Sequence, residues 1–352
     1  CIRDRFWTWY LLALVLGAAA MPLTGRLFRR FQDRGWMFSK VTAIAVSGFL
    51  TWFLVAVKII KFTTITCIVV TLVCAAASLI LYCREQKAGF ECIPFAHLDL
   101  VYAEELLFFT AFLLWTYFAG FHPAAYGTEK FMDYGFMEAM MRSTTLPARD
   151  LWYSEGTINY YYGGQYFAVF LTKLSGAKVE LTYNLMRTFV AGLAFAMPFS
   201  LVHQMVTDRL GRIRTGWKKA LPSVTGILAG ISVSIAGNMH YVVYGQIIPF
   251  IQKLKGEEVS SYWFPDATRY IGFNPDVEDK TIHEFPCYSF VLGDLHAHVV
   301  DIMFVLLLLG LLYAWMKKVR TTELSGESMR RKQFWKKQLL MPQLLAAGAL
   351  LG

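Results

Sequence analysis

The residues best suited to chemistry in this sequence are carboxylates and histidines in two polar stretches. In the second stretch, Asp294, His296 and His298 occupy alternate positions, and Glu284 lies shortly before them. Carboxylate oxygens and imidazole nitrogens are ligands for transition metal ions, and an imidazole can also donate a proton to a diphosphate. The alternative is two interfacial histidines and an aspartate that caps a helix. We favour a functional site, because such groups at a membrane boundary are costly without a role.

The first polar stretch carries a pair of acids, Glu129 and Asp133, four residues apart. This spacing would place both carboxylates on one face of a helix. Held just above the apolar segment 101–121, they could activate a hydroxyl group or hold a divalent cation. The alternative is a solvated amphipathic helix whose acids face water, and the spacing alone favours that alternative.

The same stretch continues into an aromatic segment. Asp150 and Trp152 indicate a turn with an indole at the membrane interface, in which Asp150 either caps the turn or bonds a sugar or a phosphate-bound metal beside the indole. Tyr160, Tyr161 and Tyr162 are typical of an interfacial belt. Their hydroxyl groups could also bond a glycan or a lipid phosphate.

The composition places these stretches in a membrane protein. The chain has 352 residues, of which 56% are hydrophobic and 17% charged, whereas about a quarter are charged in soluble domains. The apolar residues form uninterrupted blocks, which excludes an ordinary soluble globular enzyme. The net charge of +9 is concentrated in short stretches that set membrane orientation, so we expect no nucleic-acid partner. The six cysteines include no CxxC pair and support neither a disulfide framework nor a zinc site.

The sequence predicts an all-α polytopic membrane protein with one transmembrane domain over residues 1–352. Two long extracytoplasmic loops, 122–180 and 245–298, would contain juxtamembrane helices. We expect a fragment of a longer chain, because the sequence begins at Cys1 without Met and ends inside an apolar run. A span needs about 20 mostly apolar residues. The predicted spans are 6–23, 41–57, 63–82, 101–121, 181–206, 221–244, 299–316 and an incomplete one at 339–352.

Lysines and arginines predict the orientation of these spans. Basic clusters follow the segments 6–23, 181–206 and 299–316, and placing all three in the cytoplasm puts both long loops outside. This arrangement requires that Ile158–Leu174 does not cross the bilayer. The segment is short, rich in tyrosine and split by Gly163 and Gly164, so we interpret it as an interfacial or re-entrant helix.

Two motifs together resemble the YYY-type integral membrane proteins of bacteria and archaea, which are named for a triple tyrosine. The resemblance covers most of the chain and implies a multi-pass protein of the prokaryotic cytoplasmic membrane. One departure is Gly164-Gln165, where a histidine is expected soon after the tyrosines. The motifs are Glu129-Lys130, Asp133, Pro147, Asp150-x-Trp152 and Ile158-Asn159-Tyr160-Tyr161-Tyr162, followed by Phe285-Pro286 and Gly293-Asp294-Leu295-His296-x-His298.

The layout is also similar to that of GT-C glycosyltransferases, which are multispanning enzymes that use polyprenyl-phosphate sugars. Segment 101–121 would be the helix before their first outer loop, Glu129 or Asp133 the acid near the start of that loop, and Ile158–Leu174 its juxtamembrane helix. This likeness is one of fold and short motifs. It implies a GT-C-like helical bundle that transfers a hexosyl or pentosyl group.

The expected function is therefore sugar transfer from a polyprenyl-phosphate donor to an acceptor glycan, lipid or protein at the extracytoplasmic face of the bilayer. Glu129 or Asp133 would be the catalytic base, and Asp294 and His298 would hold a divalent cation, Mg²⁺ or Mn²⁺. The alternatives are a transporter or flippase for a lipid-linked or polyanionic solute, and a non-catalytic membrane assembly protein. The expected substrate-binding residues are Asp150, Trp152, Tyr160, Tyr161, Tyr162, Glu284 and His296.

Overall fold

The computed structural model confirms the predicted all-α fold of a polytopic membrane protein. It describes residues 2–127, 129–211, 215–273, 275–320 and 332–351, and these ranges contain helices and two isolated β-bridges but no strand. Five helices are long and apolar enough to cross a membrane. They are α1 (Ile2–Leu27), α2 (Trp36–Ala56), α3 (Thr64–Lys87), α7 (Val179–Leu210) and α11 (Ala297–Arg320).

The remaining predicted spans coincide with helices of other kinds. The helix at 101–121 is α4 (Leu98–Ala119), which has 22 residues and three acids, Asp99, Glu104 and Glu105. The incomplete segment at the end corresponds to α14 (Pro342–Leu351). The shorter helices are α5 (Lys130–Arg142), α6 (Gly163–Ser175), α8 (Leu221–Ser234), α9 (Ile248–Lys255), α10 (Pro286–Leu292) and α13 (Lys332–Leu339), with 3₁₀ turns at Phe95–His97, Gly216–Lys219 and Phe264–Thr268.

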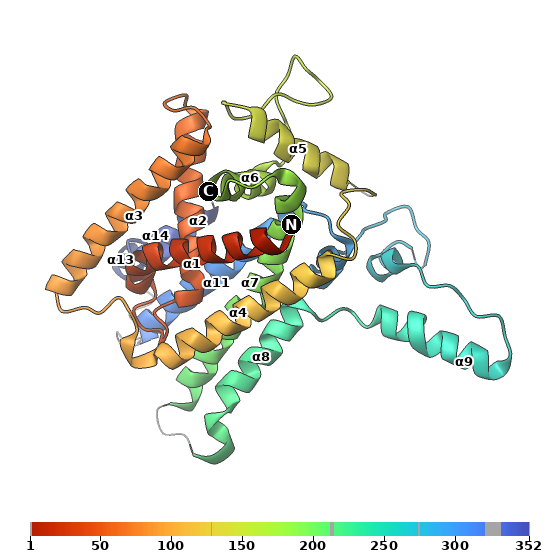
Figure 1. Ribbon diagram of the computed structural model, residues 1–352. Coiled ribbons are helices and arrows are strands. Elements are labelled where there is room, and N and C mark those ends of the chain that lie inside the picture. The colour runs from red at the N-terminus through yellow and green to blue at the C-terminus, as the bar shows by residue number, and fades with distance from the viewer. Residues whose placement is uncertain (1, 128, 212–214, 274, 321–331, 352) are drawn as a thin grey trace.

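The predicted helix over 221–244 is interrupted in the structure. Helix α8 ends at Ser234, and the chain continues into a π-helical segment, Tyr241–Ile247, and then α9. Gly and Asn are weak helix formers, and the side chain of Asn238 donates to the carbonyl of Ala267, 2.6 Å away, in the following loop. Helix α8 therefore packs along α7, while α9 projects away from the bundle (Figure 1).

Helix α6 occupies most of the segment that we interpret as interfacial or re-entrant. Its 13 residues extend about 20 Å, which is shorter than the bilayer core of about 30 Å. Nearly all its residues from Gly164 to Lys173 are buried, and it contacts α2, α5, α7 and α11. A Cβ atom on Gly164 would lie 2.8 Å from Cα of Ala297, so α6 and α11 are in very close contact. Helix α6 is thus a short buried helix inside the bundle.

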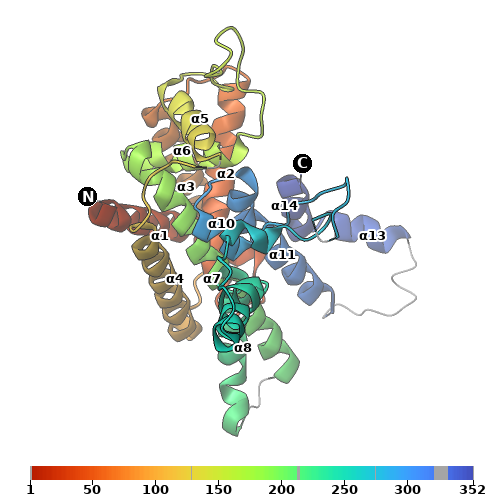
Figure 2. The ribbon, with the colours of Figure 1, turned by 90° about the vertical axis from the view of Figure 1, so that its right-hand side faces the viewer.

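Among the described residues, those beside the three basic clusters lie together at one end of the helices. The side chain of Arg30, after α1, donates to the carbonyls of Lys317 and Lys318 near the end of α11. Asp208, near the end of α7, pairs with Lys317 at 2.8 Å. The first turns of α7 and α11 lie at the opposite end, below α5 and α6 in Figure 2. The arrangement is that expected if all three basic clusters share one side of the membrane.

Candidate functional site

The candidate site is centred on His296, which lies in the short connection between α10 and α11. Its Nε2 atom is 3.3 Å from Oε2 of Glu129 and 3.6 Å from Oδ2 of Asp133. The two acids come from the start of α5, and both face the same imidazole, as their four-residue spacing predicts. The Glu129 side chain is 57% exposed, whereas that of Asp133 is 1% exposed. Of these two acids, Glu129 is therefore the one that presents its carboxylate to solvent.

Asp133 is fixed in place by Gln165, at the start of α6. The side-chain amide of Gln165 donates to Oδ1 of Asp133 over 2.7 Å and to the carbonyl of Leu295 over 3.1 Å. Burial raises the pKa of the Asp133 carboxyl to about 7, and both His296 and the hydrogen bond from Gln165 oppose this rise. Oδ2 of Asp133 accepts no hydrogen bond within the described residues and is directed towards His296.

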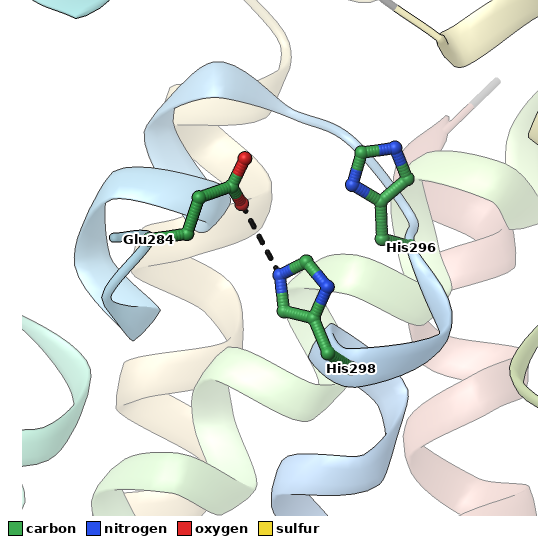
Figure 3. A group of neighbouring side chains, drawn as sticks. All are labelled: Glu284, His296 and His298. Atoms are coloured by element: carbon green, nitrogen blue, oxygen red, sulfur yellow. Dashed lines mark hydrogen bonds and ion pairs between the residues drawn. The ribbon is translucent and has the colours of Figure 1, made fainter. Parts of the chain in front are cut away.

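The other side of His296 faces Glu284 and His298. One donor atom from each of these three side chains lies within 4.8 Å of the others (Figure 3). Nε2 of His298 is 3.1 Å from Oε2 of Glu284, and the hydroxyl of Ser289 donates to the same oxygen over 2.8 Å. The hydrogen bond with His298 lowers the pKa of the Glu284 carboxyl, although burial opposes it. Two imidazoles and a carboxylate therefore converge where a metal ion could bind.

Asp294 has a different environment from the one expected. It is 1% exposed and interacts electrostatically with Lys130 and Arg187. Arg187, from α7, donates to the carbonyl of Phe290 over 3.0 Å and to Oδ1 of Asn184 over 2.7 Å. Burial lowers the pKa of Lys130, and Asp294 opposes that change. The structure thus places Asp294 among basic groups, and His298 meets Glu284 and His296 instead.

Asp150 and Trp152 lie together in a turn before the tyrosines. Oδ1 of Asp150 accepts the backbone N–H groups of Trp152 and Tyr153 over 2.8 and 2.9 Å, which is the turn-capping geometry. The Trp152 ring is exposed and lies edge-on to Phe136 of α5.

The three tyrosines do not form one surface. Tyr160 and Tyr161 are exposed, with ring centroids 4.1 Å apart, and the hydrogen bond between them raises the pKa of Tyr160 to about 12. The hydroxyl of Tyr162 instead accepts from the Trp52 indole over 3.1 Å, which ties the start of α6 to α2. Of the three, Tyr161 borders the cavity described next.

An apolar cavity of about 850 Å³ lies between α2, α6, α11 and α14. Its walls are mostly aliphatic and aromatic, with Phe49, Phe167 and Phe304 among them. Tyr161, His298 and Asp301 give it a polar end, close to the contact between α6 and α11. His298 thus belongs both to the apolar cavity and to the group of convergent donors. This volume is typical of a ligand-binding pocket.

Sequence reasoning missed four polar residues that build the site. Lys130, Gln165, Tyr183 and Arg187 surround the loop before α11, and the hydroxyl of Tyr183 accepts the backbone N–H of Leu295 over 3.2 Å. Arg187 could have been identified from the sequence, because a lone arginine inside an apolar segment is costly unless it has a partner. Gln165 stands near the position where the resemblance led us to expect a histidine.

Comparison with known proteins places the chain in a family without adding a solved fold. The family model described as Uncharacterized membrane protein (DUF2298) matches residues 46–352, a range that contains every residue of the site. No curated protein and no solved structure matches the chain.

Proposed function

The chain belongs to the DUF2298 family of membrane proteins, and from this premise we propose that it is a membrane glycosyltransferase. It would move a sugar from a polyprenyl-phosphate donor to an acceptor at the extracytoplasmic face of a prokaryotic cytoplasmic membrane. The observation that carries the proposal is that the apolar cavity and the acid–histidine site meet at His298. A polyprenyl phosphate has a long apolar chain joined to an anionic head, and these two environments are complementary to its two parts.

The exposure of the two acids suggests different roles for them. Glu129 is the exposed carboxylate, so it is our candidate for the general base that removes a proton from the acceptor hydroxyl. The acceptor oxygen would form a bond to the anomeric carbon as the bond from that carbon to the phosphate oxygen breaks. The proton would pass to Glu129, and polyprenyl phosphate would leave. Asp133 is buried against His296 and would act by positioning that imidazole.

A transfer assay with purified protein in lipid nanodiscs tests the proposal. Labelled polyprenyl-phosphate hexoses and pentoses would be supplied with membranes that contain natural acceptors. We expect transfer by the native chain and a loss of about 100-fold or more in Glu129→Gln, because general-base catalysis contributes about 10²–10⁴-fold. Glu138→Gln is the matched control, since Glu138 lies on the same helix and faces Tyr134 instead of His296. Equal rates in native protein and Glu129→Gln would refute the catalytic assignment.

A transporter or flippase for a lipid-linked or polyanionic solute is the second candidate. It is favoured by charged residues buried within long helices, namely Arg187 in α7 and Glu104 in α4. The same purified protein, reconstituted in sealed vesicles instead of nanodiscs, separates the two functions. Transport would move the intact labelled lipid between leaflets, whereas transfer would release unlabelled polyprenyl phosphate. The third alternative, a non-catalytic assembly protein, predicts that the two motifs lie apart, and their contact through His296 does not favour it.

A further inference from the structure

We propose that Glu284, His296 and His298 form a binding site for a zinc-class divalent metal ion. This inference is independent of sugar transfer, because it rests on the geometry of three side chains. Ligand atoms on a tetrahedral zinc ion are about 3.4 Å apart, given bonds of about 2.0–2.1 Å. Nε2 of His298 and Oε2 of Glu284 already stand 3.1 Å apart, and the third donor lies within 4.8 Å of both. A small side-chain movement of His296 therefore completes the site.

The orientation of His296 is the second observation. Its Nε2 atom faces Glu129 and Asp133, and Figure 3 shows the other ring nitrogen turned towards Glu284 and His298. A metal-bound histidine almost always donates its other N–H group to a carboxylate or carbonyl, which fixes the tautomer and the ring orientation. Oδ2 of Asp133 is buried and directed at Nε2 of His296, and it accepts no hydrogen bond among the described residues. A metal on Nδ1 would keep the proton on Nε2, which could donate it to Glu129 or, after a small shift, to Asp133.

The ligand types favour zinc over the expected Mg²⁺ or Mn²⁺. Two imidazoles and one carboxylate suit Zn²⁺ and related transition metals, whereas Mg²⁺ prefers an octahedral shell of oxygen atoms. The spacing of the cysteines does not indicate this zinc site, because the donors of the site are glutamate and histidine side chains. Asp294, which the sequence suggested as a ligand, lies instead beside Lys130 and Arg187.

Three protein ligands leave one position of a tetrahedral ion open, which is typical of catalytic and ligand-binding zinc sites. His298 also borders the apolar cavity, so the open position would be near its polar end. Ser289 donates to Oε2 of Glu284, the oxygen that also faces His298, and so fixes the position of that carboxylate. The site would thus accept a water molecule or one anionic oxygen of a ligand whose apolar part lies in the cavity.

Metal binding to the purified, chelator-treated full chain tests this proposal without any sugar donor. We expect about one Zn²⁺ per chain after desalting, measured by inductively coupled plasma mass spectrometry, and no retention of Mg²⁺. His298→Gln and Glu284→Gln should each abolish retention, and Asp133→Asn should weaken zinc affinity by about 10–100-fold, the usual effect of losing a carboxylate behind a histidine ligand. His283→Ala is the matched control, because His283 adjoins Glu284 in sequence but lies outside the convergent group.

X-ray absorption at the zinc edge of the native protein gives a readout that does not depend on variants. Two imidazole ligands at about 2.0–2.1 Å would support the site. Zinc retention by His298→Gln equal to that of the native chain would overturn the proposal, as would a native chain that retains no zinc. A native chain that transfers sugar but retains no zinc would refute the metal site alone, and a native chain that binds zinc but transfers no sugar would refute only the proposed function.

Discussion

Single polar contacts hold the candidate site together, and Gln165 is the clearest case. Its amide bonds both Asp133 and the backbone of Leu295, so it joins α5 to the loop before α11. Gln165→Leu would leave two buried acceptors unsatisfied, at a cost of about 1–3 kcal/mol each. We expect a lower thermal midpoint in detergent. Gln86→Leu is the control, because that amide bonds Tyr82 at the surface, and an equal effect of both variants would contradict the proposed role.

Arg187 makes a second prediction at the scale of single residues. It is buried, and it interacts electrostatically with Asp294. Arg187→Met would remove a positive charge from beside a buried carboxylate, and breaking a buried charge pair costs about 3–5 kcal/mol. We expect a large fall in the thermal midpoint that Asp294→Asn partly restores in the double variant. Additive losses in the double variant would show that the two residues do not compensate one another.

Sequence patterns located the acids and histidines of the site but not the residues that hold them. Glu129 and Asp133 could be paired from their helical spacing, and both do face one imidazole. Glu284 and His298 could not be matched as partners, because the turn through α10 brings them together. Gln165 stands alone in an apolar run, so no spacing connects it with Asp133. Contacts between residues far apart in sequence depend on tertiary packing, which local patterns do not encode.

The positions of the long helices follow from local composition more readily than the residues at which helices end. Uninterrupted apolar blocks gave the positions of α2, α3, α7 and α11. Our prediction of one continuous helix over 221–244 was wrong, because α8 ends at Ser234. The hydrogen bond from Asn238 to Ala267 beyond that end depends on a loop that folds back. Buried helix α6 was also harder to interpret, because burial against other helices and burial in an interface select the same apolar residues.

The crossing of α6 and α11 gives a prediction at the scale of whole helices. A Cβ atom at Gly164 would lie 2.8 Å from Cα of Ala297, whereas one at Gly163 would meet nothing within 4 Å. Gly164→Ala should separate the two helices and destabilise the fold by about 1–3 kcal/mol, as overpacking usually does. Gly163→Ala is the neighbouring control and should leave the thermal midpoint unchanged or raise it slightly. Equal midpoints for the two variants would contradict the close crossing.

At the scale of the whole molecule, the two ends of the bundle differ in charge and in content. At one end, Arg30 after α1 and Asp208 near the end of α7 both contact Lys317 near the end of α11. The acid–histidine site lies at the other end, where Asp133 of α5 meets His296 and Tyr183, near the start of α7, binds the loop before α11. Basic loops are retained in the cytoplasm, so this polarity predicts a site outside the cell. A site on that face favours a lipid-linked sugar donor, because nucleotide sugars are made in the cytoplasm.

Labelling of single cysteines in intact cells tests that orientation. In a cysteine-free background, Trp152→Cys, near the site, should react with a membrane-impermeant maleimide added outside. Lys219→Cys, after the basic end of α7, should react only once the membrane is permeabilised. A second external position, Tyr126→Cys, controls for local accessibility because that side chain is 87% exposed. External labelling of Lys219→Cys together with protection of Trp152→Cys would reverse the orientation, and a polyprenyl-linked donor on the outer face would then lose its basis.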